Sequence, residues 1–164
     1  MSHVKNKVKW CLKKAEKELA NKGKHRGLIL VKPSKEKAME HIKKAEHYLE
    51  ATLFLEKNFL DISASTIFYS IYHSLLAVLA KFGYESKNQE CTFALIYSLI
   101  EDKKIGIEKF LIDKVALLRD KEDSAIEIRE RYQYGTELTM KENLYKDTLE
   151  LARKILAKAK EDIM

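Results

Sequence analysis

The chain contains little glycine and almost no proline: five glycines and one proline in 164 residues. β-Sandwiches and β-barrels need frequent turns, and turns are rich in these two residues. All-β folds are therefore nearly excluded, and a helical protein with few, short connections is favoured. Hydrophobic residues make up 46% of the chain, too many for a disordered protein and enough for the core of one domain.

Cysteine is also scarce, and the two cysteines, Cys11 and Cys91, lie far apart in the sequence. We expect neither a disulfide framework nor a zinc site from them. No apolar run approaches the roughly 18 residues that span a membrane, and the first residues lack the apolar stretch of a signal peptide. We therefore expect a protein of the reducing cytoplasm without membrane association.

Motifs for metals and phosphate-binding cofactors are missing as well. The sequence has no His-Glu-x-x-His, no Glu-x-x-His and no glycine-rich phosphate loop between a strand and a helix. We expect no metal and no cofactor.

The net charge of +6 is unevenly distributed. Residues 1–35 carry eleven Lys or Arg against two Glu, a net charge of +9, whereas residues 36–164 have a net charge of −3. Apolar periodicity predicts a first helix over residues 4–21, with Trp10 on the face opposite the apolar stripe. The lysines expected beside it are Lys13, Lys14 and Lys17. This face is predicted to bind polyanions; the alternative is a solvated lysine-rich surface.

The uneven charge and the apolar periodicity divide the chain into two parts. Residues 1–33 are read as a basic N-terminal helix and linker, whose apolar run at 28–31 is too isolated to form a sheet. Residues 34–164 are read as an all-α, up-and-down antiparallel bundle, giving five or six helices in total. Its helices are expected at 34–58, 61–82, 88–100, 107–134 (with a break near 120–124) and from a capping box at Thr139–Glu142 onward.

The helix expected at 62–82 has one charged residue in its length and is apolar nearly all round. Such a helix must be buried by neighbouring helices or by a second subunit. It carries a row of small or polar residues, namely Thr66, Ser70, His73 and Ala77. We expect a homodimer, with this row as a candidate for its interface.

Two arginines and two tyrosines lie close together in the segment Arg129-Glu-Arg-Tyr-Gln-Tyr-Gly135. Arg binds phosphate in bidentate fashion and Tyr stacks on bases, so this mixture is typical of nucleotide binding. The candidate ligand-binding residues are Arg129, Arg131, Gln133 and Tyr134. The alternative is a salt-bridged helix end, because Glu127 and Glu130 lie close in sequence.

Three segments together resemble the HEPN superfamily (higher eukaryotes and prokaryotes nucleotide-binding). Residues 63–79, Ser-Ala-Ser-Thr-Ile-Phe-Tyr-Ser-Ile-Tyr-His-Ser-Leu-Leu-Ala-Val-Leu, are similar to the family's A-x-x-x-x-Y-Y-A-x-F-H-A-A-x-A-L-L pattern, with His73 at the His. Residues 83–91 resemble its G-x-x-P-K-T-H turn, with Gln89 in place of the His. Residues 129–135 resemble the R-x-x-A-D-Y-G ending of small prokaryotic members, so the resemblance covers about residues 34–161.

The resemblance implies a helical bundle that pairs as a homodimer. Many HEPN proteins are metal-independent ribonucleases with an R-x(4–6)-H motif, in which the Arg binds the scissile phosphate and the His assists proton transfer. Arg129 matches that Arg, but Tyr134 occupies the place of the His, and no histidine follows His73. Tyrosine, with an ordinary pKa near 10, is a poor general base at neutral pH. The candidate catalytic residues are thus Arg129, Tyr134 and His73.

Three functions remain open at this point. The first is a non-catalytic or weakly active HEPN domain that binds RNA, a nucleotide or a partner such as a minimal nucleotidyltransferase. The second is a metal-independent ribonuclease of a toxin–antitoxin module. The third is a structural interaction protein whose basic helix only increases solubility.

Overall fold

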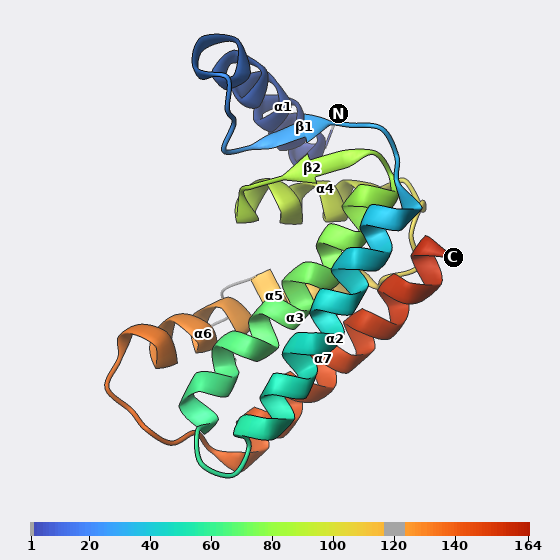
Figure 1. Cartoon of the computed structure of the whole chain (residues 1–164). Helices are drawn as coiled ribbons and strands as arrows, with labels where there is room; N and C mark the ends of the chain where they lie inside the picture. Colours follow the sequence, from blue (N-terminus) through green and yellow to red (C-terminus); the bar gives the residue numbers. More distant parts are fainter. Residues whose placement is uncertain (1, 117–123) are drawn as a thin grey trace.

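The computed structural model describes residues 2–116 and 124–164, and these residues form a helical bundle with one small sheet (Figure 1). The elements in chain order are α1 (His3–Lys22), β1 (Leu28–Leu30), α2 (Lys35–Leu55), α3 (Leu60–Lys81), β2 (Tyr84–Ser86), α4 (Gln89–Glu101), α5 (Lys109–Ala116), α6 (Ala125–Tyr134) and α7 (Glu142–Ile163). The prediction of an all-α fold is confirmed. The predicted helix at 107–134 is represented by α5 and α6, and its predicted break lies largely outside the described residues.

Helix boundaries follow local capping signals. The hydroxyl of Ser34 accepts a hydrogen bond from the Lys37 amide at the start of α2, and the Asn88 side chain caps α4 in the same way. A capping box does occur, but it is formed by Ser124 and Glu127 at the start of α6. The capping box predicted at Thr139–Glu142 is wrong, because α7 begins at Glu142 without a side-chain cap.

Helix α3 is the centre of the bundle. It packs against α2, α6 and α7, and its side chains Phe68, Ile71, Leu75 and Leu79 are fully buried. Within the described residues, α3 is the one helix long and apolar enough to cross a membrane, but 61% of its apolar window is buried inside the chain. Its composition is that of a core helix, and burial within a single chain accounts for it.

The row of small and polar residues on α3 packs against α2 of the same chain. The Ser70 hydroxyl donates to the Ala45 carbonyl at 2.8 Å, and the hydroxyls of Thr66 and Thr52 are 2.6 Å apart. The expectation that this row lies at a subunit interface is therefore wrong. Small side chains do allow close helix approach here, but the approaching helix is the chain's own α2.

The segment predicted to be too isolated for a sheet forms one. Strand β1 pairs antiparallel with β2, placing Leu28 opposite Ser86 and Leu30 opposite Tyr84. Gly83 makes the turn into β2 possible: its φ is +85°, and a Cβ there would lie 2.9 Å from the Pro33 ring and from the Val31 carbonyl oxygen. The sheet forms because the chain after α3 returns beside the segment that precedes α2.

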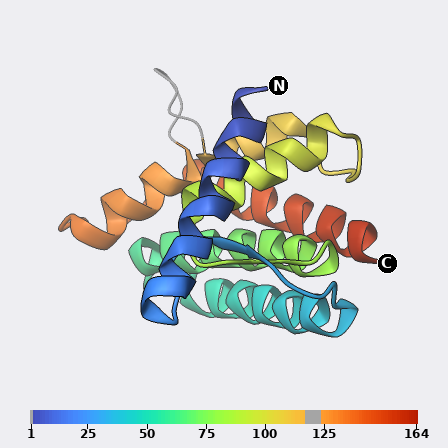
Figure 2. The ribbon, with the colours of Figure 1, turned by 90° about the horizontal axis from the view of Figure 1, so that it is seen from above.

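Helix α1 is docked on the body of the protein. It packs against α4 and β1 and lies across one end of the molecule (Figures 1 and 2). Its buried side chains are Val8, Cys11 and Ala15, which follow one another at spacings of three and four residues along one side of the helix. The basic N-terminal segment is thus a fixed part of the fold.

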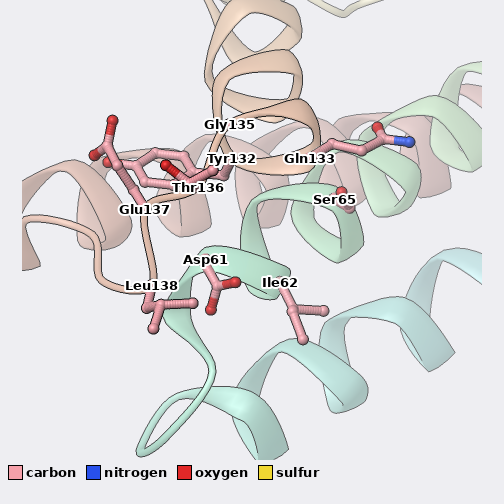
Figure 3. A pocket seen from close by; sticks show the side chains of 9 residues that line it. All are labelled: Asp61, Ile62, Ser65, Tyr132, Gln133, Gly135, Thr136, Glu137 and Leu138. Atoms are coloured by element: carbon pink, nitrogen blue, oxygen red, sulfur yellow. The ribbon is translucent and has the colours of Figure 1, made fainter.

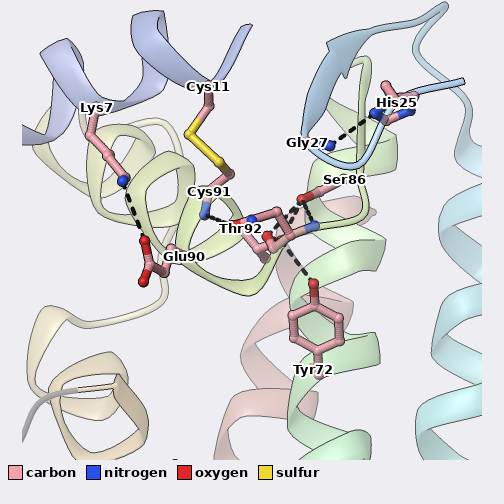
Figure 4. Close-up of a disulfide and its surroundings, with 10 residues drawn as sticks. Lys7, Cys11, His25, Gly27, Tyr72, Ser86, Glu90, Cys91 and Thr92 are labelled. Carbon is pink, nitrogen blue, oxygen red and sulfur yellow. Dashed lines mark hydrogen bonds and ion pairs between the residues drawn. A yellow bond between two sulfur atoms is a disulfide. The ribbon is translucent and has the colours of Figure 1, made fainter. Parts of the chain in front are cut away.

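Docking of α1 brings the two cysteines together, and they form a disulfide between α1 and α4 (Figure 4). The expectation that these cysteines form no disulfide is wrong, and the reducing compartment inferred from it loses its support. Their separation of 80 residues was a poor guide, since distance along the chain does not limit proximity in the fold. Ion pairs join the same surfaces, with Lys5 and Asp102 2.6 Å apart and Lys7 and Glu90 3.3 Å apart.

Candidate functional site at the end of α6

Arg129 projects from α6 onto the central helix. Only 8% of the residue is exposed, and its guanidinium carbon lies 4.6 Å from the centroid of the Phe68 ring on α3. Nη1 donates to Gln133 Oε1 at 3.0 Å, whereas Nη2 is 3.9 Å from the Glu130 carboxylate. Within the described residues, Nε is buried and has no hydrogen-bond partner. A buried cationic donor in this state retains capacity to bind an anion.

A cavity of about 370 Å³ lies beside this arginine, between the first turns of α3 and the chain that follows α6 (Figure 3). Its lining residues are Asp61, Ile62, Ser65, Tyr132, Gln133, Gly135, Thr136, Glu137 and Leu138. Gln133 belongs to this lining and is also the hydrogen-bond partner of Arg129. Arg129 and Gln133 are four residues apart on α6, so they lie on one face of the helix and are in direct contact.

Tyr134 is 75% exposed and is not among the residues that line the cavity. Gly135 ends α6 directly after it. The Arg131 guanidinium carbon lies 5.9 Å from the ring centroid of Tyr132. Of the four predicted ligand-binding residues, the structure joins Arg129 and Gln133, and leaves Tyr134 at the surface next to them.

His73 lies on another side of α3. Its Nδ1 is 3.0 Å from Nδ1 of His41 on α2, and its ring stacks on Tyr48. Burial, together with the nearby positive charges of His41 and Lys44, lowers the pKa of His73 from 6.5 to about 4. At 3.6 residues per turn, His73 is roughly 140° around α3 from Phe68, so it does not face Arg129.

The outward face of α1 has the arrangement expected from the sequence. Trp10 is 52% exposed, and Lys13, Lys14 and Lys17 are exposed beside it. The Nζ atoms of Lys7 and Lys14 lie 4.6 and 5.1 Å from the centroid of the indole ring. Lys7 is the member of this group that the sequence analysis missed, although its position one turn before Trp10 would have identified it.

Several residues of the site lie beyond the reach of sequence patterns. Asp61, Ser65 and Thr136 line the cavity only because the start of α3 lies beside the segment after α6. His41 is likewise brought to His73 by helix packing and by no motif. In the described part of the chain, no three His, Cys, Asp or Glu side chains are grouped closely enough to hold a metal ion.

Comparison with known proteins identifies the family. No curated protein matches the chain. A family model described as HEPN domain matches residues 38–163, from the first turn of α2 to the end of α7, and it includes His73 and Arg129 but excludes α1 and β1. Since the match covers well over half of the sequence, the chain belongs to the HEPN family.

Proposed function

We propose that this protein is a HEPN domain that binds RNA or a nucleotide without cleaving it. Membership in the family supports a nucleotide- or RNA-related function. The observation that carries the non-catalytic proposal is the residue five positions after Arg129, where HEPN ribonucleases have His and this chain has Tyr134.

No other histidine of the chain supplies the missing base. The five histidines all precede α4, and the one that matches the family's first motif, His73, is held against His41 and Tyr48 on a different side of α3 from Arg129. The Tyr134 phenol is a poor proton acceptor at neutral pH. Arg129 can therefore bind a phosphate group, but no imidazole beside it can accept a 2′-hydroxyl proton.

Binding at this site would use Arg129 as the anion donor and the exposed Tyr134 ring as a surface for a base. Gln133 is exposed and accepts from Arg129, so its side chain can turn away when a phosphate oxygen takes the Nη1 hydrogen bond. The Nε atom is buried, so the phosphate would bind through Nη1. The cavity that Gln133 lines provides further room for the ligand.

The first experiment compares Arg129→Ala with the parent protein in a binding titration using a labelled single-stranded RNA and free nucleotides. Loss of a charged hydrogen bond predicts an affinity lower by about 1.5–3 kcal/mol. Arg153→Ala, at an exposed arginine of α7, is the matched control and should bind normally. If Arg129→Ala only lowers the melting temperature and leaves affinity intact, Arg129 is a structural anchor on Phe68 and the proposed site is wrong.

A second experiment restores the missing histidine. Tyr134 is exposed, so Tyr134→His should fold normally and recreate the R-x4-H motif with Arg129. We expect metal-independent RNA cleavage by this variant and none by the parent protein. Efficient cleavage by the parent protein that Arg129→Ala abolishes would contradict the non-catalytic proposal and favour the ribonuclease of a toxin–antitoxin module.

We also propose a homodimer, but through a different face of α3 from the one first expected. A stripe of residues that are not buried runs along α3 and consists of Ile62, Ser65, Tyr69, Tyr72 and Leu76, of which Tyr69 also contacts Tyr48 of α2. Leu76→Glu should weaken self-association measured by light scattering, whereas Leu53→Glu, at an exposed leucine of α2, should not. A parent protein that stays monomeric at micromolar concentration would refute this proposal.

We also propose a minimal nucleotidyltransferase as the partner protein and the cytoplasm as the location. The partner is proposed from the family resemblance, and co-purification of the two proteins is its test. The disulfide argues against an ordinary reducing cytoplasm, but intracellular proteins of hyperthermophiles retain disulfides. The chain has only two Gln and is rich in Lys and Glu, a composition that resembles that of thermophile proteins.

A further inference from the structure

Helix α1 lies outside the HEPN match, yet it is held rigidly against the domain. The Cys11–Cys91 disulfide joins its middle to α4, and the Ser2 hydroxyl donates to the Glu101 carboxylate at 2.8 Å near its start. The Lys5 ion pair acts on the same side of the helix, whereas Lys7 pairs with Glu90 from a position beside Trp10. The opposite side therefore has a fixed position and needs no ordering when it binds a ligand.

That opposite side, here called the Trp10 face, consists of Trp10, Lys13, Lys14 and Lys17. At 3.6 residues per turn, the three lysines lie within about 60° of Trp10 around the helix. Among the described residues, Lys13, Lys14 and Lys17 form no ion pair. Lys14 makes a cation–π contact with the indole ring of Trp10. The face thus combines a half-exposed aromatic ring with ammonium groups that no carboxylate neutralises.

We infer that the Trp10 face binds single-stranded RNA, with a base stacked on Trp10 and the neighbouring phosphates on the lysines. Stacking on an aromatic side chain combined with a basic surface along the backbone is how single-stranded nucleic acids are bound without sequence preference. A duplex does not fit this chemistry, because its bases are already stacked on each other. Lys14 contacts the indole ring and leaves it for a phosphate when the base arrives.

A membrane surface is a poorer match for the same face. Amphipathic helices that bind membranes insert their apolar side into the bilayer. In α1 that side contains Val8, Cys11 and Ala15, which are buried against the protein. The charge complementarity of the Trp10 face is therefore better met by a polyanion with flat, stackable groups than by a lipid surface.

The experiment uses Trp10 as its own reporter, since it is the only tryptophan in the chain. Titration of the full-length protein with a single-stranded oligoribonucleotide should quench the tryptophan fluorescence as the base stacks. Inorganic polyphosphate, which has charge but no bases, should bind without comparable quenching. Quenching by anionic phospholipid vesicles but not by RNA would overturn the inference in favour of a membrane surface.

Matched variants separate stacking from charge. Trp10→Ala should weaken RNA binding by about tenfold or more, measured by anisotropy of a labelled RNA. Lys13→Ala combined with Lys17→Ala should reduce the slope of log affinity against log salt by about 1.4, at about 0.7 per lost phosphate contact. Lys57→Ala combined with Lys154→Ala removes the same charge from exposed sites on other elements and should leave the slope unchanged.

The two sites fail independently. Arg129→Ala should retain the fluorescence quenching at Trp10 even where it lowers total affinity, because Arg129 lies on α6. RNA that binds Trp10→Ala as tightly as the parent protein, or that saturates the protein without changing its fluorescence, would refute the role of the Trp10 face. Neither result would affect the proposal for Arg129.

Discussion

Reduction of the Cys11–Cys91 disulfide should destabilise the protein strongly. The bond closes a loop of 80 residues, and both cysteines are buried. Constraining an unfolded chain through a loop of that length is worth about 4.5 kcal/mol in the chain-entropy treatment. For a domain of this size, 1 kcal/mol shifts the melting temperature by about 2–4 °C, so reduction should lower it by roughly 9–18 °C.

The assay is thermal unfolding followed by circular dichroism, with and without dithiothreitol. The double variant Cys11→Ala and Cys91→Ala is the control: it should melt near the reduced parent protein and should not respond to the reductant. Equal melting temperatures for oxidised and reduced parent protein would refute the entropic argument. Two thiols that react with iodoacetamide in the unreduced, denatured protein would show that the bond does not form.

Two further predictions concern the bundle itself. The pKa of His73 is about 4 in the folded protein, below its ordinary 6.5, so the unfolded chain takes up a proton at His73 at a higher pH than the folded chain does. The free energy of unfolding should therefore fall as the pH drops from about 6.5 to 4. The expected loss is about 1–2 kcal/mol after allowance for solvent screening. Denaturant titrations should show a flatter profile for His73→Gln and an unchanged one for the exposed His47→Gln; a parent profile already flat over this range would contradict the argument. Gly83→Ala should cost roughly 2 kcal/mol or more, because φ is +85° and the Cβ would meet Val31 and Pro33. A melting temperature unchanged by Gly83→Ala would refute the need for glycine there.

Much of the fold was predictable because its signals are local. Ser34 and Asn88 cap α2 and α4, Gly83 follows α3 in the left-handed conformation, and Gly135 ends α6. Each signal depends on a few neighbouring residues, and so it survives whatever the rest of the chain does. The apolar stripe of α7, with Thr148, Leu151, Ile155 and Ala159 buried, is predictable for the same reason.

The row Thr66, Ser70, His73 and Ala77 shows where such patterns stop. Small residues at helical spacing indicate that another helix approaches closely, but they do not say which one. Two hydrogen-bonding contacts from this row to Thr52 and Ala45 identify α2. A prediction of subunit interfaces from composition alone fails here because a chain with seven described helices can bury an apolar helix by itself.

The sheet and the disulfide were missed for one shared reason. Leu28 pairs with Ser86, and Cys11 bonds to Cys91. Both pairs join the first part of the chain to the β2–α4 segment, and both exist once α1 docks on α4. No short-range pattern encodes that docking, since it depends on two apolar surfaces separated by the whole of α2 and α3. The same event turns the lysine-rich N-terminal segment from a solvated arm into a fixed surface, and it is this fixed position that makes the Trp10 face a binding surface with a defined geometry.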